Sequence, residues 1–268
     1  MTRIKFKLQG FPQIKEGKLD LDNSQVILNG QNYSINQLTF DNPISGTLYG
    51  TVLNYKGEYE LLKPEMDEKP YQKPPEAPVL YIKPVNTFSS HQKPIPLPEG
   101  EEQVQIGAAL GLVIGQTATK VKAEDALDYI EGYTVVNDVS LPFASVYRPA
   151  IKQKARDGFC PIGPWIVKRD EIKDPHQLTT KVWVNGELKQ ENNTNNLIRT
   201  IPELLEDVTE FMTLYEGDVL LVGVPEHQPY ARLGDRVKIE VEHVGFLEHD
   251  VVKESDVYTR EVSADEVR

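Results

Sequence analysis

Four cationic side chains lie close together in the middle of the sequence: Arg148, Lys152, Lys154 and Arg156. Lysine and arginine hold carboxylates through charge-assisted hydrogen bonds. The segment is rich in neither aromatic residues nor glycine, which favours a small anion over a strand of RNA. We therefore expect it to bind a small anion. Taken alone, Lys154 is equally well interpreted as an exposed loop lysine.

The remaining reactive residue types indicate no common cofactor. Cys160 is the only cysteine, and no histidine stands in its motif, Gly158-Phe159-Cys160-Pro161. It is therefore expected to be a small buried apolar group and not a nucleophile. The five histidines show no metal-ligand spacing. Neither a phosphate loop nor a GxGxxG motif follows a strand, so the sequence favours neither zinc nor nucleotide binding.

Composition narrows the class of partner. The 268 residues include 41 acidic and 29 basic side chains, a net charge of −12, which repels nucleic acid. No apolar run approaches the roughly 20 residues of a membrane helix. The spacing of Gly107, Gly111 and Gly115 thus predicts close backbone packing in a sheet, and no membrane partner is expected. The N-terminus has no signal-peptide pattern, which predicts a cytoplasmic protein.

Strand patterns dominate the chain. The dipeptides Asn29-Gly30 and Asn185-Gly186 each join two strand-like segments and favour the type I′ turn of a hairpin. Residues 110–115 form an almost continuous apolar run, typical of a strand buried on both faces. Residues 237–242 alternate apolar and polar side chains, which predicts a half-buried strand.

Two segments have helical periodicity, residues 123–130 and residues 201–212. Thr200 and Glu203 form a capping box before the second segment. Between 62 and 78 the chain is polar and rich in proline, a composition that stiffens a linker and interrupts helices. We expect a small N-terminal β-rich domain over 1–62, a proline-rich linker over 63–77 and a larger mixed domain, mainly β, over 78–268.

Several ordered segments between Val79 and Gly245 resemble the catalytic domain of the fumarylacetoacetate hydrolase family: LYIKPVNTF, PIPLP, ALGLVIG, ALDYIEGYTVVNDVS, KARDGFCPIGPW, VNGELKQ and LYEGDVLLVGVP. The resemblance implies an α+β, mainly β fold, with a catalytic β-roll domain behind the small N-terminal domain. Family members bind Mg²⁺, Mn²⁺ or Ca²⁺ and hydrolyse, decarboxylate or isomerise acylpyruvate-type or 2-oxo dicarboxylate compounds. A divalent ion chelated by a 2-oxo acid stabilises the enolate that forms in such reactions.

The family's metal ligands are a Glu-x-Glu pair and a later aspartate. The corresponding positions here are Gly107, Ala109 and Asp138, so one ligand of three is retained. We therefore expect no catalytic divalent ion and no cofactor in this chain, and Mg or Mn in a partner subunit. Without its co-ligands, Asp138 is also well interpreted as a backbone cap in a turn. Glu58 stands where family members often carry a histidine base.

Further roles follow from the resemblance, residue by residue. Lys154 and Asp157 match the family's K-x-x-D motif, in which the lysine holds a carboxylate or an enolate oxygen. The expected catalytic residues are Lys154, Asp138 and Glu58. The expected substrate-binding residues are Arg148, Lys152, Lys83, Asn137 and Asp157.

The segment NDVSLPFASVYRPAIKQKARDGFCPIG, together with the emptied metal positions, resembles the first half of a duplicated branch of the family. That branch decarboxylates 5-carboxymethyl-2-oxo-hex-3-ene-1,7-dioate and isomerises the product in aromatic acid breakdown. The resemblance implies a subunit that acts as a homodimer or with a homologous metal-bearing subunit. Two hypotheses stay open: the chain is itself an enzyme, or it is a non-catalytic structural subunit of an active relative.

Overall fold

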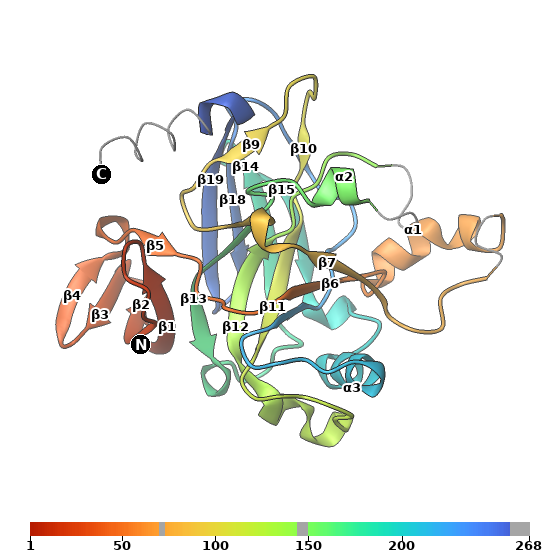
Figure 1. Ribbon diagram of the computed structural model, residues 1–268, viewed down its shortest axis with the longest axis horizontal. Helices are drawn as coiled ribbons and strands as arrows, with labels where there is room; N and C mark the ends of the chain where they lie inside the picture. The colour runs from red at the N-terminus through yellow and green to blue at the C-terminus, as the bar shows by residue number, and fades with distance from the viewer. Residues whose placement is uncertain (70–72, 144–149, 258–268) are drawn as a thin grey trace.

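The computed structural model describes residues 1–69, 73–143 and 150–257, and strands make up most of its regular structure (Figure 1). The α+β, mainly β fold predicted from the sequence is confirmed. A 12-stranded sheet and a five-stranded sheet form the body of the molecule. Within the described ranges, no helix has both the length and the apolar character needed to cross a membrane.

The large sheet has the strand order β4-β3-β2-β1-β13-β12-β11-β16-β6-β7, with β5 beside β1 and β8 beside β13. Its strands are β1 (Thr2–Leu8), β2 (Lys15–Asp20), β3 (Gln25–Leu28), β4 (Gln31–Ser34), β5 (Phe40–Asp41), β6 (Leu48–Val52), β7 (Val79–Lys83), β8 (Phe88–Ser89), β11 (Ala108–Ile114), β12 (Ile130–Asn137), β13 (Cys160–Lys168) and β16 (Val219–Leu221). The N-terminal hairpins, at the left of Figure 1, join the central strands where Ile4 of β1 pairs with Val167 of β13.

Strand β11 is buried along its whole length, as its apolar run predicts. Its side chains alternate between two hydrophobic clusters. Leu110 and Leu112 belong to the main core, whereas Ala109 and Val113 belong to a second cluster on the other face of the sheet. A strand covered on both faces needs apolar residues at every position, which explains the absence of alternation.

The second sheet has the order β15-β14-β18-β19-β9 and contacts β11, β12 and β13 of the large sheet. Its strands are β9 (Ile95–Leu97), β14 (Thr179–Val184), β15 (Glu187–Asn193), β18 (Arg236–Val241) and β19 (Gly245–Lys253), and a separate pair consists of β10 (Val104–Gln105) and β17 (Tyr230–Ala231). Both predicted hairpin turns are confirmed: Asn29 and Asn185 have φ values of 51° and 53°, and a positive-φ glycine follows each.

The helical elements are α1 (Lys56–Met66), α2 (Ile151–Lys154), α3 (Ile201–Phe211) and the 3-10 helices η1 (Ile35–Gln37), η2 (Val85–Thr87), η3 (Ala123–Tyr129), η4 (Arg169–Glu171) and η5 (Thr194–Asn196). The capping box before α3 is present: Thr200 accepts from the backbone N–H of Glu203, whose carboxylate accepts from Thr200 N–H. The first predicted helix, residues 123–130, is the 3-10 helix η3.

Helix α1 enters the segment that we predicted as a linker, since it continues to Met66 with Pro64 inside it. Strand β6 precedes this helix and β7 follows it, and the two strands pair in antiparallel register, Leu48 opposite Lys83. Strand β6 also pairs in parallel with β16. These hydrogen bonds attach part of the predicted N-terminal unit to the central sheet. The division into 1–62, 63–77 and 78–268 stays a proposal.

Candidate active site

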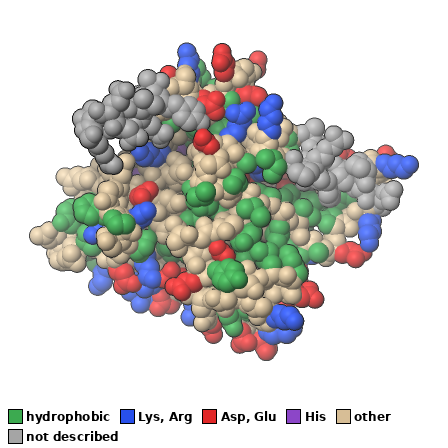
Figure 2. All heavy atoms as spheres, viewed as in Figure 1, with side chains coloured by type: hydrophobic (Ala, Val, Ile, Leu, Met, Phe, Trp, Pro, Cys, Tyr) green, Lys and Arg blue, Asp and Glu red, His purple; other side chains and the backbone are tan. Residues whose placement is uncertain are grey.

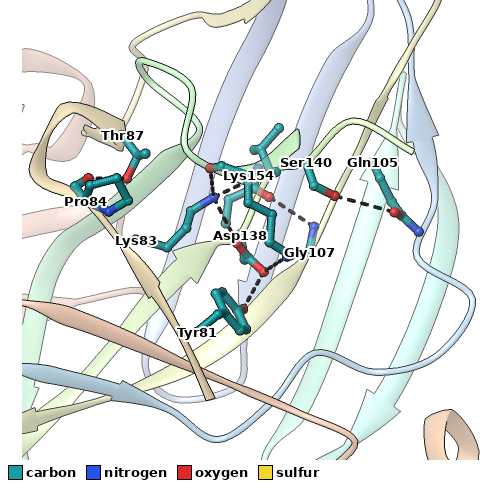
Figure 3. A network of polar contacts seen from close by, with 11 residues as sticks. Tyr81, Lys83, Pro84, Thr87, Gln105, Gly107, Asp138, Ser140 and Lys154 are labelled. Atoms are coloured by element: carbon teal, nitrogen blue, oxygen red, sulfur yellow. Dashed lines mark hydrogen bonds and ion pairs between the residues drawn. The ribbon is translucent and has the colours of Figure 1, made fainter. Parts of the chain in front are cut away.

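Asp138 follows the last residue of β12, is 1% exposed and lies at the centre of a polar cluster (Figure 3). The Nζ of Lys83, from β7, is 3.0 Å from its Oδ1. The Nζ of Lys154, from α2, is 2.6 Å from its Oδ2, and the hydroxyl of Tyr81 donates to the same oxygen at 2.5 Å. Tyr81 and Lys83 are two residues apart on one strand, so both point to the same face. Both oxygens of Asp138 are thereby engaged.

Lys83 joins three parts of the chain. Besides its ion pair, its fully buried ammonium group donates to the backbone carbonyls of Val139 at 2.9 Å and Lys154 at 2.8 Å. Three oxygen atoms therefore surround a charge that has no access to water, which offsets much of the cost of burying it. The contacts fix β7, the turn after β12 and α2 relative to one another.

The charges in this cluster stabilise the ionised form of Asp138. Burial opposes ionisation, but the ammonium groups of Lys154 and Lys83 outweigh it, and the pKa of Asp138 lies well below its ordinary value. Burial also lowers the pKa of Lys83, against the attraction of Asp138. Burial and the neighbouring carboxylate raise the pKa of Tyr81 well above its ordinary value, so this phenol stays a hydrogen-bond donor.

A pocket of about 680 Å³ opens beside this cluster. Its polar lining includes Glu58, Asp138, Lys154 and Glu226, and its wall is otherwise mainly apolar, with side chains from α1, β7 and α2. In Figure 2, hydrophobic side chains gather on the face that carries β7 and α1. A mostly apolar concavity with a few converging charged groups is the usual form of a small-molecule site.

Glu58 reaches the pocket from the first turn of α1. Its Oε2 accepts a hydrogen bond at 2.8 Å from the backbone N–H of Leu53, a residue in the left-handed region with φ of 62°. Burial raises the pKa of Glu58 to about 7. A carboxyl group with this pKa exchanges protons readily near neutral pH, which suits general acid–base chemistry.

The residues at the family's metal position do not fit a divalent ion. Gly107 and Ala109 supply no side-chain oxygen, and both oxygens of Asp138 already contact a lysine ammonium group. A Cβ added at Gly107 would lie 2.5 Å from the backbone oxygen of Asp138, so the backbone itself fills the space of a ligand side chain. Among the described residues, no group of three His, Cys, Asp or Glu could hold a metal ion.

The predicted catalytic residues Lys154, Asp138 and Glu58 all line the pocket. Among the described residues, the other predicted substrate ligands, Lys83, Asn137, Lys152 and Asp157, do not line it. Lys83 and Asn137 are buried in the scaffold, where the Asn137 side chain accepts from the backbone N–H of Gly107 at 3.3 Å.

Two more of the predicted ligands have other surroundings. Asp157 is exposed and accepts from Asn86, and Lys152 is exposed on α2. Arg156 contacts Glu254. Arg148 lies outside the described residues. The roles assigned to all of these residues in substrate binding stay predictions.

Sequence reasoning missed two residues of the pocket. Tyr81 binds Asp138 and could have been found, since it precedes Lys83 by two residues in the segment LYIKPVNTF and shares its face if that segment is a strand. Glu226, in the loop before β17, carries no pattern that relates it to Glu58. The two meet through tertiary structure alone.

Comparison with known proteins identifies the family of this chain. The family model described as fumarylacetoacetate (FAA) hydrolase C-terminal matches residues 47–252. The chain therefore belongs to the fumarylacetoacetate hydrolase family. It is 42% identical over 217 residues to the 4-hydroxyphenylacetate degradation bifunctional isomerase/decarboxylase of Escherichia coli, a match that covers 81% of this chain and 49% of the relative. The chain thus spans about half the length of that relative.

Two solved structures have the same fold. The 2-hydroxyhepta-2,4-diene-1,7-dioate isomerase of Mycobacterium marinum has a TM-score of 0.75 and 26% identity, covering 95% of this chain and 99% of the other. The maleylpyruvate hydrolase of Sphingobium sp. SYK-6, in complex with manganese(II) and pyruvate, has a TM-score of 0.74 and 23% identity, covering 93% and 99%. The second likeness shows the fold alone.

Proposed function

We propose that this chain is a subunit of an enzyme that isomerises 2-hydroxyhepta-2,4-diene-1,7-dioate and decarboxylates 5-carboxymethyl-2-oxo-hex-3-ene-1,7-dioate in the breakdown of 4-hydroxyphenylacetate. The observation that carries the proposal is that Lys154 and Glu58, a cation and a proton carrier, line one pocket. The names of the similar E. coli and M. marinum proteins supply the substrate class. We expect the cytoplasm as the compartment.

The isomerisation moves one proton and two double bonds. The proton leaves the 2-hydroxyl oxygen, the 2,4-diene becomes a 3-ene, and a proton is added at the fifth carbon, so atoms and charge balance. In this proposal Lys154 holds the 2-oxygen while negative charge develops on it. Glu58, whose pKa is about 7, gives its proton to the fifth carbon, and the proton released from the 2-hydroxyl restores the acid form of Glu58. In the decarboxylation, the bond between the fifth carbon and its carboxylate breaks and carbon dioxide leaves. The electron pair of that bond moves through the conjugated system to the 2-oxygen, which takes up a proton to give the 2-hydroxy-2,4-diene.

The test compares the purified chain with the chain mixed with a homologous subunit that carries the Glu-x-Glu pair. Loss of the diene absorbance measures isomerisation, and released carbon dioxide measures decarboxylation. We expect isomerisation by the chain alone and faster turnover of both reactions by the mixture. The proposal fails if the chain is inactive alone and also leaves the turnover of the homologous subunit unchanged.

A second candidate function has an observation in its favour, because Gly107 and Ala109 supply no side-chain oxygen at two of the three expected ligand positions of the family's metal. In this alternative the chain is a non-catalytic structural or regulatory subunit, and its family framework serves to pair with a subunit that holds Mg or Mn. The two functions differ in one measurement on the chain alone. An enzyme accelerates proton exchange at the carbon next to the keto group, whereas a structural subunit does not.

A further inference from the structure

Glu226 brings a second carboxylate to the pocket that holds Glu58. Strand β15 fixes it from two directions. The side chain of Asn192 donates to Oε1 of Glu226 at 3.1 Å. Gln190 donates to the backbone carbonyls of Pro225, at 3.2 Å, and Glu226, at 2.5 Å. Both the backbone and the head group of Glu226 are therefore held by an element that the pocket does not otherwise use.

The carboxylate of Glu226 lies directly against Gly57, the residue before Glu58. A Cβ added at position 57 would be 2.2 Å from the carboxyl carbon of Glu226, far inside van der Waals contact. A side chain at position 57 would therefore have to displace the carboxylate of Glu226. The first turn of α1 and the loop that carries Glu226 meet at this point, with Glu58 one residue away.

The second oxygen of Glu226 is in an unusual position. Oε2 is buried and has no hydrogen-bond partner among the described residues. No hydrogen bond offsets the negative charge on this buried oxygen. A second negative charge on a neighbouring carboxyl group is therefore disfavoured. The ionisable groups that act on Glu58 are Glu226, Asp138 and Lys154. Lys154 is the cation among them, and its ammonium group already contacts Asp138.

We propose that Glu226 is a positioning residue for Glu58: its fixed carboxylate adds to the burial of Glu58 in favouring the protonated form, so that Glu58 faces the pocket as an acid. Burial is the largest cause of the raised pKa of Glu58, about 7, and the charges of Glu226 and Asp138 add to it, whereas the hydrogen bond from Leu53 N–H and the charge of Lys154 oppose it. The use of this proton for addition to carbon rests on the proposed function. The protonation itself does not.

The experiment is a pH titration of Glu58 by carbon NMR of the glutamate carboxyl groups, with the signal assigned by its loss in Glu58→Gln. Glu226→Gln keeps the size of the side chain and an oxygen for Asn192, but removes the charge. We expect the midpoint of Glu58 to fall by about one pH unit toward the ordinary glutamate value. Glu60→Gln is the matched control on the same helix, since Glu60 is exposed and pairs with Lys63. It should leave the midpoint unchanged.

Gly57→Ala provides an independent variant. Alanine favours helix more than glycine does, so α1 should persist while the new Cβ displaces the carboxylate of Glu226, and the midpoint should again fall. An unchanged midpoint in folded Glu226→Gln or Gly57→Ala protein overturns the proposal, as does a midpoint near about 4.3 in the natural chain. A chain that shows the expected shift but no isomerisation contradicts the proposed function only.

Discussion

Lys154 links the two sides of the candidate site. Its ammonium group contacts Asp138 and lies 4.6 Å from the centre of the Tyr81 ring, while the same side chain lines the pocket with Glu58. The pairing with Asp138 orients the lysine without help from the ligand. A cation oriented in advance stabilises developing negative charge at little reorganisation cost.

Replacing Lys154 tests that role. We expect Lys154→Met to lower the isomerisation rate by about 10²-fold or more, the usual effect of losing one group that stabilises an oxyanion. Steady-state kinetics on the natural and variant chains measure it. Lys173→Met, at an exposed position outside the pocket, is the control and should retain the natural rate. Equal rates for natural and Lys154→Met protein would remove Lys154 from the chemistry.

Metal binding, like the isomerisation rate, depends on single residues. One carboxylate that is already paired with two lysines has little attraction left for a divalent ion, so we expect a dissociation constant of ~1 mM or weaker. Calorimetry with Mn²⁺ measures it. The paired substitution Gly107→Glu and Ala109→Glu should improve binding only modestly, because the new Cβ at 107 meets the backbone oxygen of Asp138. Micromolar binding to the natural chain would contradict this expectation.

Sequence analysis identified the pocket residues that belong to ordered family motifs. It missed those that only tertiary contacts bring to the pocket. Lys154 and Asp138 stand in recognisable segments, and Glu58 replaces a residue of known position. Glu226 has no such context, because its approach to Gly57 depends on the hydrogen bonds of β15. The engagement of Asp138 by Lys83 was missed for the same reason, since strand pairing sets which lysine reaches it.

At the level of helices and strands, the sequence predicted those features that depend on a few neighbouring residues. The Asn-Gly turns and the capping box at Thr200 needed no tertiary information. Helix α1 was not predicted, because Pro64 in a proline-rich segment favours a linker. The proline lies two residues before the end of the helix, and contacts of the apolar face, with Met66 fully buried, stabilise it.

The capping box gives a prediction for α3. We expect Thr200→Ala to lower the free energy of unfolding by about 1 kcal/mol, since the N–H of Glu203 loses its side-chain acceptor. Urea denaturation measures the change. Thr200→Ser keeps the hydroxyl oxygen and should cost much less. A loss of equal size in both variants would mean that the cap oxygen contributes nothing.

At the scale of the whole molecule, two buried histidines tie stability to pH. His91 packs edge-on against Phe40 and Phe246, and the Nδ1 of His249 lies 2.8 Å from the carbonyl of Lys93. Burial lowers the pKa of His91 to about 4 and that of His249 to about 3. The unfolded chain takes up these protons near pH 6.5, so each histidine destabilises the fold as pH falls from 6.5 toward its folded-state pKa.

Between pH 7 and pH 5 each histidine lowers the free energy of unfolding by roughly 2 kcal/mol. Glu58 acts in the opposite direction, because its raised pKa favours the folded state at the lower pH. Histidine variants separate the effect of the histidines from that of Glu58. We expect His91→Gln to lose less unfolding free energy over this interval than the natural chain, whereas His243→Gln, at an exposed histidine, should follow the natural chain. Identical pH slopes for all three would refute the assignment to His91.

The pocket draws its walls from residues within 51–62, 79–82, 138–143, 150–155 and 224–228, which are far apart along the chain. A small molecule bound there would act as a temporary cross-link between segments that the covalent chain joins only through long loops. Because such a molecule binds the folded chain and not the unfolded one, it should slow amide hydrogen exchange in β6, β7 and β16 together, as one cooperative unit. Ligand occupancy would then be readable from the backbone protection of β16, which does not line the pocket.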